Sequence, residues 1–567
     1  LFTSPALPIS GISWLNIILY SLFFLIVADL GARKPALIWR LPLPIFLAFS
    51  FNCLSGLLQF KAFSFLGTDS TGYTGLYTWW PFKTSDAINY FAGLQAPSRL
   101  SSAAGTLGNQ NVLGGYLTAT IPLFTILPMI VIARWRQMVD GILWRYQRLS
   151  EGSANALVGA LVLVLGANAI ISYAAILATD TRGAWIGMAA ALLLAIAIVP
   201  AFFREQLGKV SRLNWSKILL GVIVSLVLLG AISYSAGITP KRLQGKIMST
   251  WTIKQRLVAW EVAVAMANER PVLGQGLGTY KIRYFHYLAQ RFAGKPIPTY
   301  MHHRYVQAHN DLVQLAAEAG YVGLLLGMIV LGIFWIAIPR YIWRRRPSVA
   351  EGLLLLAAMM GTIGMTVFAI SGFPFHIAAS SAVWTALAGM AGAFLWRERR
   401  EQLRSLAQES QAYELPLGAR WVFAVVTGVF AAALVFFIYL PYRADILTKE
   451  GMERYKQGKV TEAATFLKKA IALDPERGDA RLVLGITLAM TNHLKEAADQ
   501  LIRSQTSYDD VTLHYYLGRV YEAQQNEPAA RAEYNKALSY FPEGTEVRKI
   551  VTERLALMSA NKGSASP

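Results

Sequence analysis

The sequence is poor in cysteine and in charge, and each shortage excludes a class of protein. Its single cysteine, Cys53, lies in an apolar block, so no disulfide can form within the chain. Only 15% of the residues are charged and 54% are hydrophobic, whereas soluble globular proteins carry about 25% charged residues. The first residues, Leu1 to Gly11, lack a basic stretch, so we expect no cleaved signal peptide there. A soluble, disulfide-stabilised protein is therefore excluded.

Long apolar blocks dominate instead, and they predict membrane-spanning helices. Several blocks reach the length of about 20 residues that crosses a bilayer. Inside lipid the backbone must form hydrogen bonds within its own segment, and these blocks do not alternate as barrel strands do. The fold class expected is therefore all-α, a polytopic transmembrane helix bundle. We predict ten spans, near 14–30, 41–60, 111–132, 156–178, 183–203, 217–236, 321–339, 352–371, 376–396 and 420–440.

The basic residues predict how the spans are oriented. Short cytoplasmic loops collect Lys and Arg, and here every second loop is basic: Arg33, Lys34 and Arg40; Arg134, Arg136, Arg145 and Arg148; Arg204, Lys209, Arg212 and Lys217; Arg340 and 344–346; Arg397, Arg399, Arg400 and Arg404. The segment 61–110, the loop 237–320 and everything after about residue 441 are then on the side opposite the cytoplasm, which we expect to be the periplasm. This pattern accounts for the net charge of +20, so membrane lipids are expected as partners and nucleic acid is not.

The last part of the chain is charged, rich in alanine and repetitive. Glycines 451, 485 and 518 recur at spacings of 34 and 33, and alanines 463, 497 and 530 recur in step with them. A period near 34 with such small residues resembles tetratricopeptide repeats. We predict a membrane domain over 1–441, a periplasmic α-helical repeat domain over 442–560 and a disordered tail over 561–567.

Two arginines in predicted periplasmic loops are candidates for binding phosphate. Arg182 lies in a tight turn between two spans, and Arg256 lies before apolar residues of helical spacing, where we expect it to open an amphipathic helix. A guanidinium binds phosphate through two parallel hydrogen bonds. The alternative for either arginine is contact with lipid headgroups at the interface. The aromatic segment 73–82 is interpreted as an interfacial belt, with sugar stacking as the alternative.

The stretch 308–320 predicts a short helix that carries a histidine at its start. Asn310, Gln314 and Glu318 form one polar stripe on that helix, and Gly320 is expected to end it. His309 precedes the stripe, where a helix N-terminus disfavours the imidazolium and keeps a general base neutral. A hydrogen-bonded structural histidine is the alternative. His302 and His303 are interpreted as loop residues, because no spacing supports a metal site. The glycine-rich run 271–278 is interpreted as a tight turn and not as a nucleotide loop.

These motifs together resemble the O-antigen ligase and polymerase superfamily. His309-Asn310 followed by Gly320 and Gly323 is similar to its His-Asn…Gly…Gly motif. The resemblance extends over about 99–396 and is carried by further residues in the same order: Asn109 and Asn111 in its Gly-Thr…Asn-x-Asn segment, Arg182 and Arg256 as its two arginines, Trp260 four residues after Arg256, and Gly274 and Gly276 in its glycine run. The chain departs from the family in having ten predicted spans where about twelve are common, and in its repeat domain.

The resemblance implies a GT-C-like helix bundle in the bacterial inner membrane, and an enzyme that needs neither metal nor cofactor. Such an enzyme transfers a glycan from a polyprenyl-diphosphate carrier with inversion at the anomeric carbon. By resemblance, Arg182 and Arg256 hold the diphosphate and His309 is the general base. The acceptor stays open between lipid A core, a second repeat unit and a protein hydroxyl, and the repeats are expected to recruit a protein acceptor or partner. Two other classes are a polysaccharide export component, which predicts ionisable residues within the spans, and a membrane-anchored scaffold.

Overall fold

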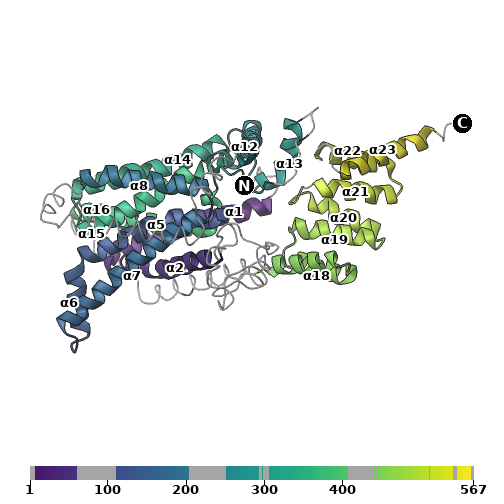
Figure 1. Ribbon diagram of the computed structural model, residues 1–567. Coiled ribbons are helices and arrows are strands. Elements are labelled where there is room, and N and C mark those ends of the chain that lie inside the picture. Colours follow the sequence, from purple (N-terminus) through teal and green to yellow (C-terminus); the bar gives the residue numbers. More distant parts are fainter. Residues whose placement is uncertain are drawn as a thin grey trace.

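All regular secondary structure in the described part of the chain is helical (Figure 1). The computed structural model describes residues 7–59, 110–202, 251–292, 297, 305–406, 425, 440, 443–509, 511–540 and 546–563. The all-α expectation is confirmed for these residues. Several predictions fall outside them: the span 217–236, nearly all of the span 420–440, the aromatic segment 73–82, Asn109, and the histidines 302 and 303.

Seven helices of the described part are long and apolar enough to cross a membrane. They are α1 (Leu7–Arg33), α2 (Pro42–Gln59), α5 (Gln110–Ala133), α7 (Glu151–Ala178), α14 (Asp311–Arg345), α15 (Val349–Ala369) and α16 (Ala378–Leu406). An eighth, α8 (Arg182–Phe202), carries a shorter apolar stretch. These eight helices coincide with eight of the ten predicted spans, because hydropathy over a bilayer's thickness is a strong local signal. The chain is thus a multi-pass membrane protein.

The bundle has one central helix and one peripheral helix that matter for the site. In α15, 83% of the spanning residues are buried within the protein, whereas in α14 the figure is 6%. Helix α15 packs against α5 and α8, and α1 packs against α16. Most of the span in α14 therefore lies on the outside of the described bundle, and its N-terminal end reaches toward α12 (Trp251–Glu269) and α13 (Tyr280–Arg291) (Figure 1).

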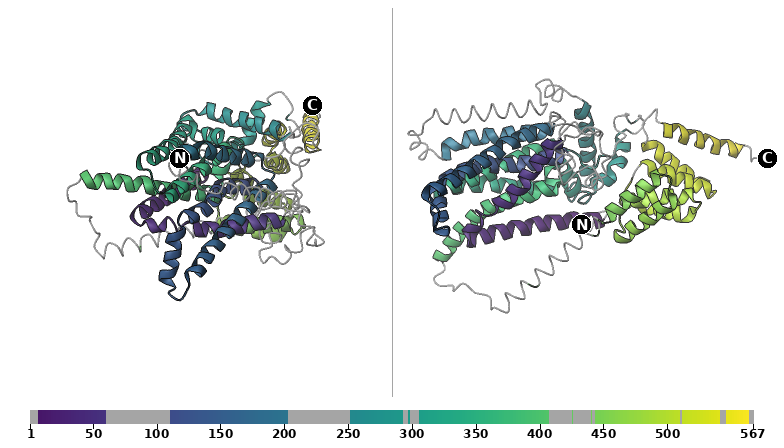
Figure 2. Two further views of the ribbon diagram at one scale, coloured as in Figure 1. Left: turned by 60° about the vertical axis from the view of Figure 1, so that its left-hand side comes forward. Right: turned by 60° about the horizontal axis from the view of Figure 1, so that its bottom comes forward.

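The extramembrane helices α12 and α13 share a small aromatic core with the start of α14. Tyr280, Tyr284 and Phe285 of α13 are buried there against Met266 of α12 and Ala317 of α14. Each aromatic side chain removes a large apolar area from water, which stabilises the packing of these helices against one another. The helix α6 (Trp135–Arg145), which carries predicted cytoplasmic arginines, lies at the opposite end of the bundle (Figure 2).

The C-terminal part is a stack of antiparallel helices, as the periodicity predicted. After a helical segment at 443–456 come α18 (Val460–Leu473), α19 (Gly478–Met490), α20 (Leu494–Ser504), α21 (Val511–Ala523), α22 (Glu527–Tyr540) and α23 (Glu546–Gly563). The three periodic glycines occupy equivalent places. A Cβ added to them would lie 2.7 Å from Leu467, 2.6 Å from Leu501 and 2.6 Å from Tyr534, respectively. Because α23 continues to Gly563, the predicted tail 561–567 is helical over its first three residues.

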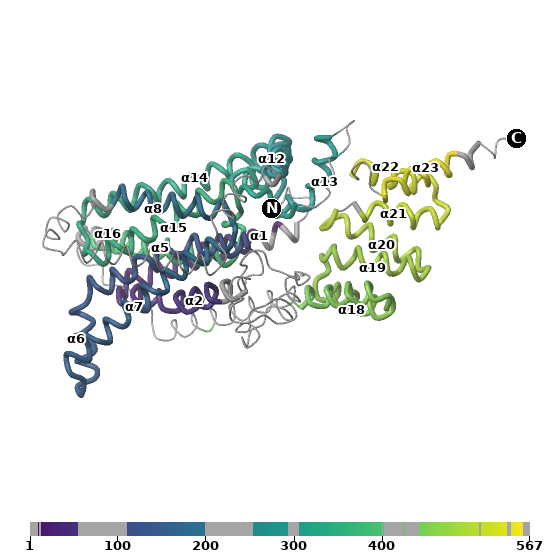
Figure 3. The backbone as a smooth tube through the Cα atoms, viewed as in Figure 1, coloured from purple at the N-terminus to yellow at the C-terminus, as the bar shows by residue number. Residues whose placement is uncertain are grey.

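The repeats lie at the same end of the chain's bundle as α12 and α13 (Figure 3). Helix α22 touches α13, where Tyr540 stacks on Phe285 with ring centroids 5.8 Å apart and planes inclined by 23°. Tyr540 is also part of the aromatic core of α12 and α13. The repeat region is therefore in direct contact with the extramembrane helix α13 and its aromatic core.

Candidate active site

Arg182 is the first residue of α8 and follows a tightly held turn. Asp180 has a positive φ of 54°, and the Thr181 hydroxyl donates to the Gln110 carbonyl oxygen at 3.2 Å and to Asn111 Oδ1 at 3.5 Å. These contacts tie the turn to the start of α5. Of the two asparagines predicted to support the site, Asn111 therefore supports the backbone that presents Arg182.

Arg256 lies within α12 and close to Arg182. The helix begins at Trp251, so the expectation that Arg256 opens it is wrong; residues 251–255 already have helical backbone. Burial and the positive charge of Arg182 lower the pKa of Arg256, and Tyr305 opposes the shift. The two guanidinium groups are thus near enough to repel each other. A shared anion would relieve this repulsion and accept charge-assisted hydrogen bonds from both.

His309 lies beside Arg256, in a strained backbone and an aromatic cage. Its φ is 55°, which is uncommon for a residue other than glycine. The imidazole meets Tyr305 and Phe373 edge to face, with centroids at 5.7 Å and 4.9 Å. Burial and the Arg256 charge lower the pKa of His309 to about 4. A lowered pKa favours the neutral ring at pH 7, in agreement with the expectation of a neutral base, and burial and the Arg256 charge contribute to it.

The predicted polar stripe holds the backbone around His309 in place. Asn310 is the N-cap of α14, and its Oδ1 accepts the N–H groups of Leu312 and Val313 at 3.1 Å and 3.2 Å. Gln314 Oε1 accepts the N–H of Ala308 at 2.8 Å. The buried amide and cap oxygens thus fix the residues on both sides of His309.

Glu318, the third residue of the stripe, binds the glycine-rich turn. Its carboxylate accepts the N–H groups of Gly278 at 2.7 Å and Tyr280 at 3.2 Å, and the Gln314 amide at 3.2 Å. The N–H groups of Gln275 and Gly276 donate to the carbonyl oxygens of Ala317 and Glu318 in return. The interpretation of 271–278 as a tight turn is confirmed.

Gly320 and Gly274 make this contact possible. Gly320 has φ 71° and ψ 179°, which breaks α14 into a short first segment and the span proper, as predicted. Gly274 has φ 67°. A Cβ on Gly320 would collide with the Val272 carbonyl, and one on Gly274 would collide with the backbone of Glu318. The combination of positive φ and direct backbone contact requires glycine at both positions.

We expect Gly320→Ala to destabilise the protein, measured as a lower midpoint of thermal unfolding in detergent. The backbone conformation alone costs about 1–3 kcal/mol for an alanine, and the collision with Val272 adds to it. Gly332→Ala on the same helix is the matched control, because nothing lies within 4 Å of its added Cβ. Equal unfolding midpoints for the two variants would contradict the tight contact between the turn and α14.

A second histidine that sequence reasoning missed lies next to this cluster. His376 ends the short 3-10 helix η6 (Pro374–His376), and its Nδ1 contacts the Asp311 carboxylate, which also accepts the Phe375 N–H at 2.8 Å. Burial opposes protonation, but Asp311 and then Glu318 raise the pKa of His376 to about 9. No local pattern connects positions 311 and 376, so only the fold reveals the pair.

Trp260 and Tyr305 are two further residues on or beside the segments that carry Arg256 and His309. Trp260 follows Arg256 by one helical turn, and its indole Nε1 is buried without a hydrogen bond to any described residue. His309 Nδ1 is also buried without a hydrogen bond to any described residue. Tyr305, which sequence reasoning also missed, contacts His309 and influences Arg256. Buried polar atoms of this kind call for a partner, and a bound substrate is one way to supply it.

The structure thus defines a multi-pass membrane protein with an extramembrane cationic site and a helical repeat region. Residues 167–328 match the O-antigen ligase family, a range that includes Arg182, Arg256 and His309. Residues 454–510 and 495–544 match two tetratricopeptide repeat families. The chain contains an O-antigen ligase domain followed by C-terminal tetratricopeptide repeats, as the sequence resemblance implied.

A curated human protein also matches part of the chain. It is the protein O-mannosyl-transferase TMTC1 of Homo sapiens, 30% identical over 112 residues. The aligned region is 19% of this chain and 13% of the human protein. The likeness therefore concerns a segment of each protein.

Proposed function

We propose that the protein transfers a glycan from a polyprenyl-diphosphate carrier to an acceptor hydroxyl, on the periplasmic side of the bacterial inner membrane. The observation that supports the proposal is that residues far apart in the chain affect one another's charge: the Arg182 charge acts on Arg256, and the Arg256 charge acts on His309. Two guanidinium groups beside a neutral imidazole suit a reaction with an anionic leaving group and a hydroxyl nucleophile.

The proposed reaction is a single displacement at the anomeric carbon of the donor sugar. The acceptor oxygen forms a bond to the anomeric carbon, and the bond from that carbon to the diphosphate oxygen breaks. The electron pair leaves on polyprenyl diphosphate, whose growing charge Arg182 and Arg256 stabilise. The acceptor proton passes to the imidazole of His309. Attack opposite the leaving group inverts the anomeric configuration.

The low pKa of His309 is compatible with this role because the donor changes it. In the unliganded protein the Arg256 charge helps to lower that pKa to about 4. A bound diphosphate places negative charge between Arg256 and the imidazole, and negative charge favours imidazolium. Donor binding is therefore expected to raise the pKa of His309 toward the range in which a general base is most effective.

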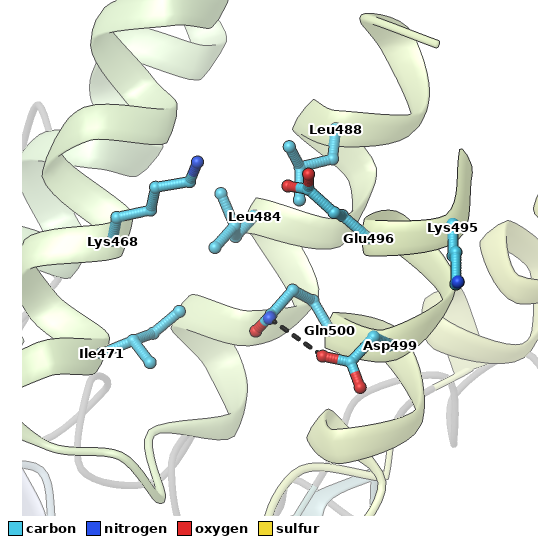
Figure 4. A pocket seen from close by; sticks show the side chains of 8 residues that line it. All are labelled: Lys468, Ile471, Leu484, Leu488, Lys495, Glu496, Asp499 and Gln500. Atoms are coloured by element: carbon cyan, nitrogen blue, oxygen red, sulfur yellow. Dashed lines mark hydrogen bonds between the residues drawn. The ribbon is translucent and has the colours of Figure 1, made fainter. Parts of the chain in front are cut away.

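Glycosylation of a protein hydroxyl is a second candidate, and two observations favour it. The segment likeness is to a protein whose name states transfer of mannose to protein. In addition, the repeats contact α13 through Tyr540 and Phe285, which would bring a protein held by the repeats to the site. A hollow of about 400 Å³ between α18, α19 and α20 has an apolar floor at Leu484 and Leu488 and a charged rim (Figure 4). It supports a partner-binding role for the repeats.

Reconstitution tests the proposal. The full-length protein in vesicles receives an oligosaccharide linked to polyprenyl diphosphate, with lipid A core, a second lipid-linked unit or a protein offered separately. We expect release of polyprenyl diphosphate with at least one acceptor, and unchanged release in the presence of a metal chelator. A ladder of products indicates polymerisation, and a single product indicates ligation. Absence of donor turnover with every acceptor would overturn the proposal.

A further inference from the structure

A continuous row of ring contacts runs from the repeats to the candidate base. Tyr540, the last residue of α22, stacks on Phe285 of α13 with ring centroids 5.8 Å apart. The Phe285 ring meets Tyr284 edge to face at 5.4 Å, and the Tyr284 ring meets Tyr305 at 5.7 Å. Tyr305 then meets the His309 imidazole edge to face at 5.7 Å. These rings form the aromatic row, which connects the repeats, α13 and the segment before α14.

The aromatic row is tightly packed where it crosses from the repeats into α13. Tyr540, Phe285 and Tyr284 are 2%, 2% and 0% exposed, and all three belong to the core shared by α12 and α13. Protein interiors are close-packed and transmit strain, so a ring that moves displaces its neighbours. A change at Tyr540 therefore affects α13, and Tyr284 is the ring that connects α13 to Tyr305.

On the repeat side, a buried network of polar groups orients Tyr540. Its hydroxyl donates to Asp509 Oδ2 at 3.1 Å, and its ring meets His514 edge to face at 5.4 Å. The His514 imidazole is fully buried and lies 2.8 Å from Asp509 and 2.6 Å from Glu533. Burial opposes protonation of His514, but its hydrogen bonds to Asp509 and Glu533 raise its pKa. A fully satisfied network of this kind is rigid, so it presents Tyr540 in one orientation.

Electrostatic interactions also join the repeats to α13. Burial and the Asp509 carboxylate raise the pKa of Tyr540, and the positive charge of Arg283 on α13 opposes the shift. Arg283 in turn lies 3.9 Å from the Glu269 carboxylate of α12. The contact with the repeats thus involves a residue that links α13 to α12, and α12 is the helix that carries Arg256.

At the other end of the row, the orientation of His309 depends on ring contacts. Tyr305 and His309 lie in backbone without regular secondary structure, and a positive φ such as that of His309 persists only where the surrounding structure fixes it. The rings of Tyr305 and Phe373 meet the imidazole, and Tyr305 in turn meets Tyr284 of α13. A general base must lie within hydrogen-bond reach of the proton that it accepts. The position of α13 therefore affects whether the imidazole is correctly oriented.

From this arrangement we propose that Tyr540 is a positioning residue for His309, and that the repeats form part of the support of the active site. Tyr540 holds α13 through Phe285, and α13 holds the imidazole through Tyr284 and Tyr305. Tyr540 acts through these rings and not by contact with substrate. This inference rests on the proposed function for the role of His309 as a base. It gives the repeats a part in the transfer step itself, in addition to any partner that they recruit.

Carbethoxylation of histidines by diethylpyrocarbonate tests this coupling without requiring turnover. The reagent modifies accessible, neutral imidazoles, and labelled peptides of the full-length protein in nanodiscs are quantified by mass spectrometry. We expect Tyr540→Ala to raise the labelling rate of His309 at least about five-fold, because the imidazole loses part of its packing and opens locally more often. His493, which is exposed on the repeats, is the internal reference, and its labelling rate should not change.

Matched variants separate the aromatic contact from general damage to the repeats. Tyr540→Phe keeps the stacked ring and loses only the hydrogen bond to Asp509, so we expect most of the protection of His309 to remain. Tyr516→Ala removes a half-buried ring that packs against the core of the repeats, and it should leave the labelling of His309 unchanged. If Tyr540→Ala does not fold, Tyr540→Leu retains most of the apolar volume and still removes the ring.

A double-mutant cycle tests whether the effect passes through α13. Phe285→Leu removes the other ring of the stacked pair, and its effect on the labelling of His309 should match that of Tyr540→Leu. The two substitutions together should have little more effect than either alone, because they remove the same contact. Independent effects that multiply would show that Tyr540 does not act through Phe285, and would overturn the aromatic row as the connection.

Glycan transfer separates this inference from the proposed function. Tyr540→Ala should lower kcat at least about ten-fold, since a small misplacement of a reacting group is costly. KM for the donor should stay unchanged, because Arg182 and Arg256, which are proposed to bind it, are not part of the aromatic row. Unchanged labelling of His309 in both Tyr540→Ala and Tyr540→Leu, or an equal rise in Tyr516→Ala, would overturn the positioning role and leave the transferase untouched. Faster labelling in Tyr540→Ala, when the unmodified protein transfers no glycan, would retain the coupling and reject the transferase.

Discussion

Replacing His309 with alanine is expected to reduce glycan transfer by about 10²–10⁴-fold, the usual contribution of a general base. The expected loss is in kcat, with KM for the donor little changed, because the imidazole acts on the acceptor proton and the arginines hold the donor. The measurement is release of polyprenyl diphosphate in reconstituted vesicles. Retention of full activity by a folded His309→Ala protein would remove this residue from the reaction.

His286→Ala is the matched control for this variant. His286 lies on α13, and its imidazole contacts the Gln290 side chain at 3.0 Å; the charges that act on it are those of Arg283, Asp509, Glu269 and Lys536, and neither Arg182 nor Arg256 is among them. We expect it to retain activity. If both histidine variants lose activity to the same degree, the loss reflects damage to the extramembrane helices and not the removal of a base.

The pH dependence gives the same hypothesis a second readout. A base must be neutral to accept a proton, so activity falls as pH decreases through its pKa. The profile of kcat/KM reports the free enzyme, in which the pKa of His309 is lowered to about 4. Because a bound diphosphate favours imidazolium, kcat should fall at a higher pH than kcat/KM does. Identical acid limbs in both profiles would contradict the coupling between donor and base.

Replacing Arg256 with alanine is expected to lower kcat/KM for the donor by about 10²–10³-fold, the effect of removing one group that stabilises developing negative charge. Arg256→Lys should restore only part of it, because an ammonium cannot form the two parallel bonds of a guanidinium. The decrease in kcat/KM should also depend on the charge of the donor. An Arg256→Ala protein as active as the unmodified protein would reject Arg256 as a diphosphate ligand.

The control for Arg256 lies two residues earlier on the same helix. Lys254 is exposed, and Lys254→Ala removes the same charge from α12 without touching the site, so activity should persist. The coupling to His309 offers a further check. Since the Arg256 charge contributes to the lowered pKa of His309, Arg256→Ala should raise that pKa and move the acid limb of the kcat/KM profile to higher pH.

The elements that sequence reasoning predicted well depend on signals within one segment. The spans follow from apolar blocks as long as a bilayer is thick, and eight of ten predicted spans have a matching helix among the described residues. The repeats follow from small residues at a fixed period, where Gly485 leaves room for Leu501 of the next helix. Gly320 was predicted as a helix end because glycine alone tolerates its backbone conformation.

The features that sequence reasoning missed depend on contacts between distant segments. Tyr305 and Phe373 enclose the His309 ring from two sides, yet neither carries a local motif. The pair formed by Asp311 and His376 joins positions 65 residues apart. The sequence predicted a neutral His309 from the helix N-terminus alone, whereas burial and the Arg256 charge, which also lower its pKa, are properties of the folded protein.

The sequence by itself determined that this chain spans a membrane repeatedly, ends in helical repeats and carries two arginines and a histidine in its extramembrane segments. Hydropathy, periodicity and residue type are local quantities, so they are readable without coordinates. Only the tertiary structure decided that burial and the Arg182 charge lower the pKa of Arg256, and that burial and the Arg256 charge lower the pKa of His309. It also decided that Asp311, against the effect of burial, raises the pKa of His376. Burial and electrostatic interaction depend on distances through space, which a linear order of residues does not contain.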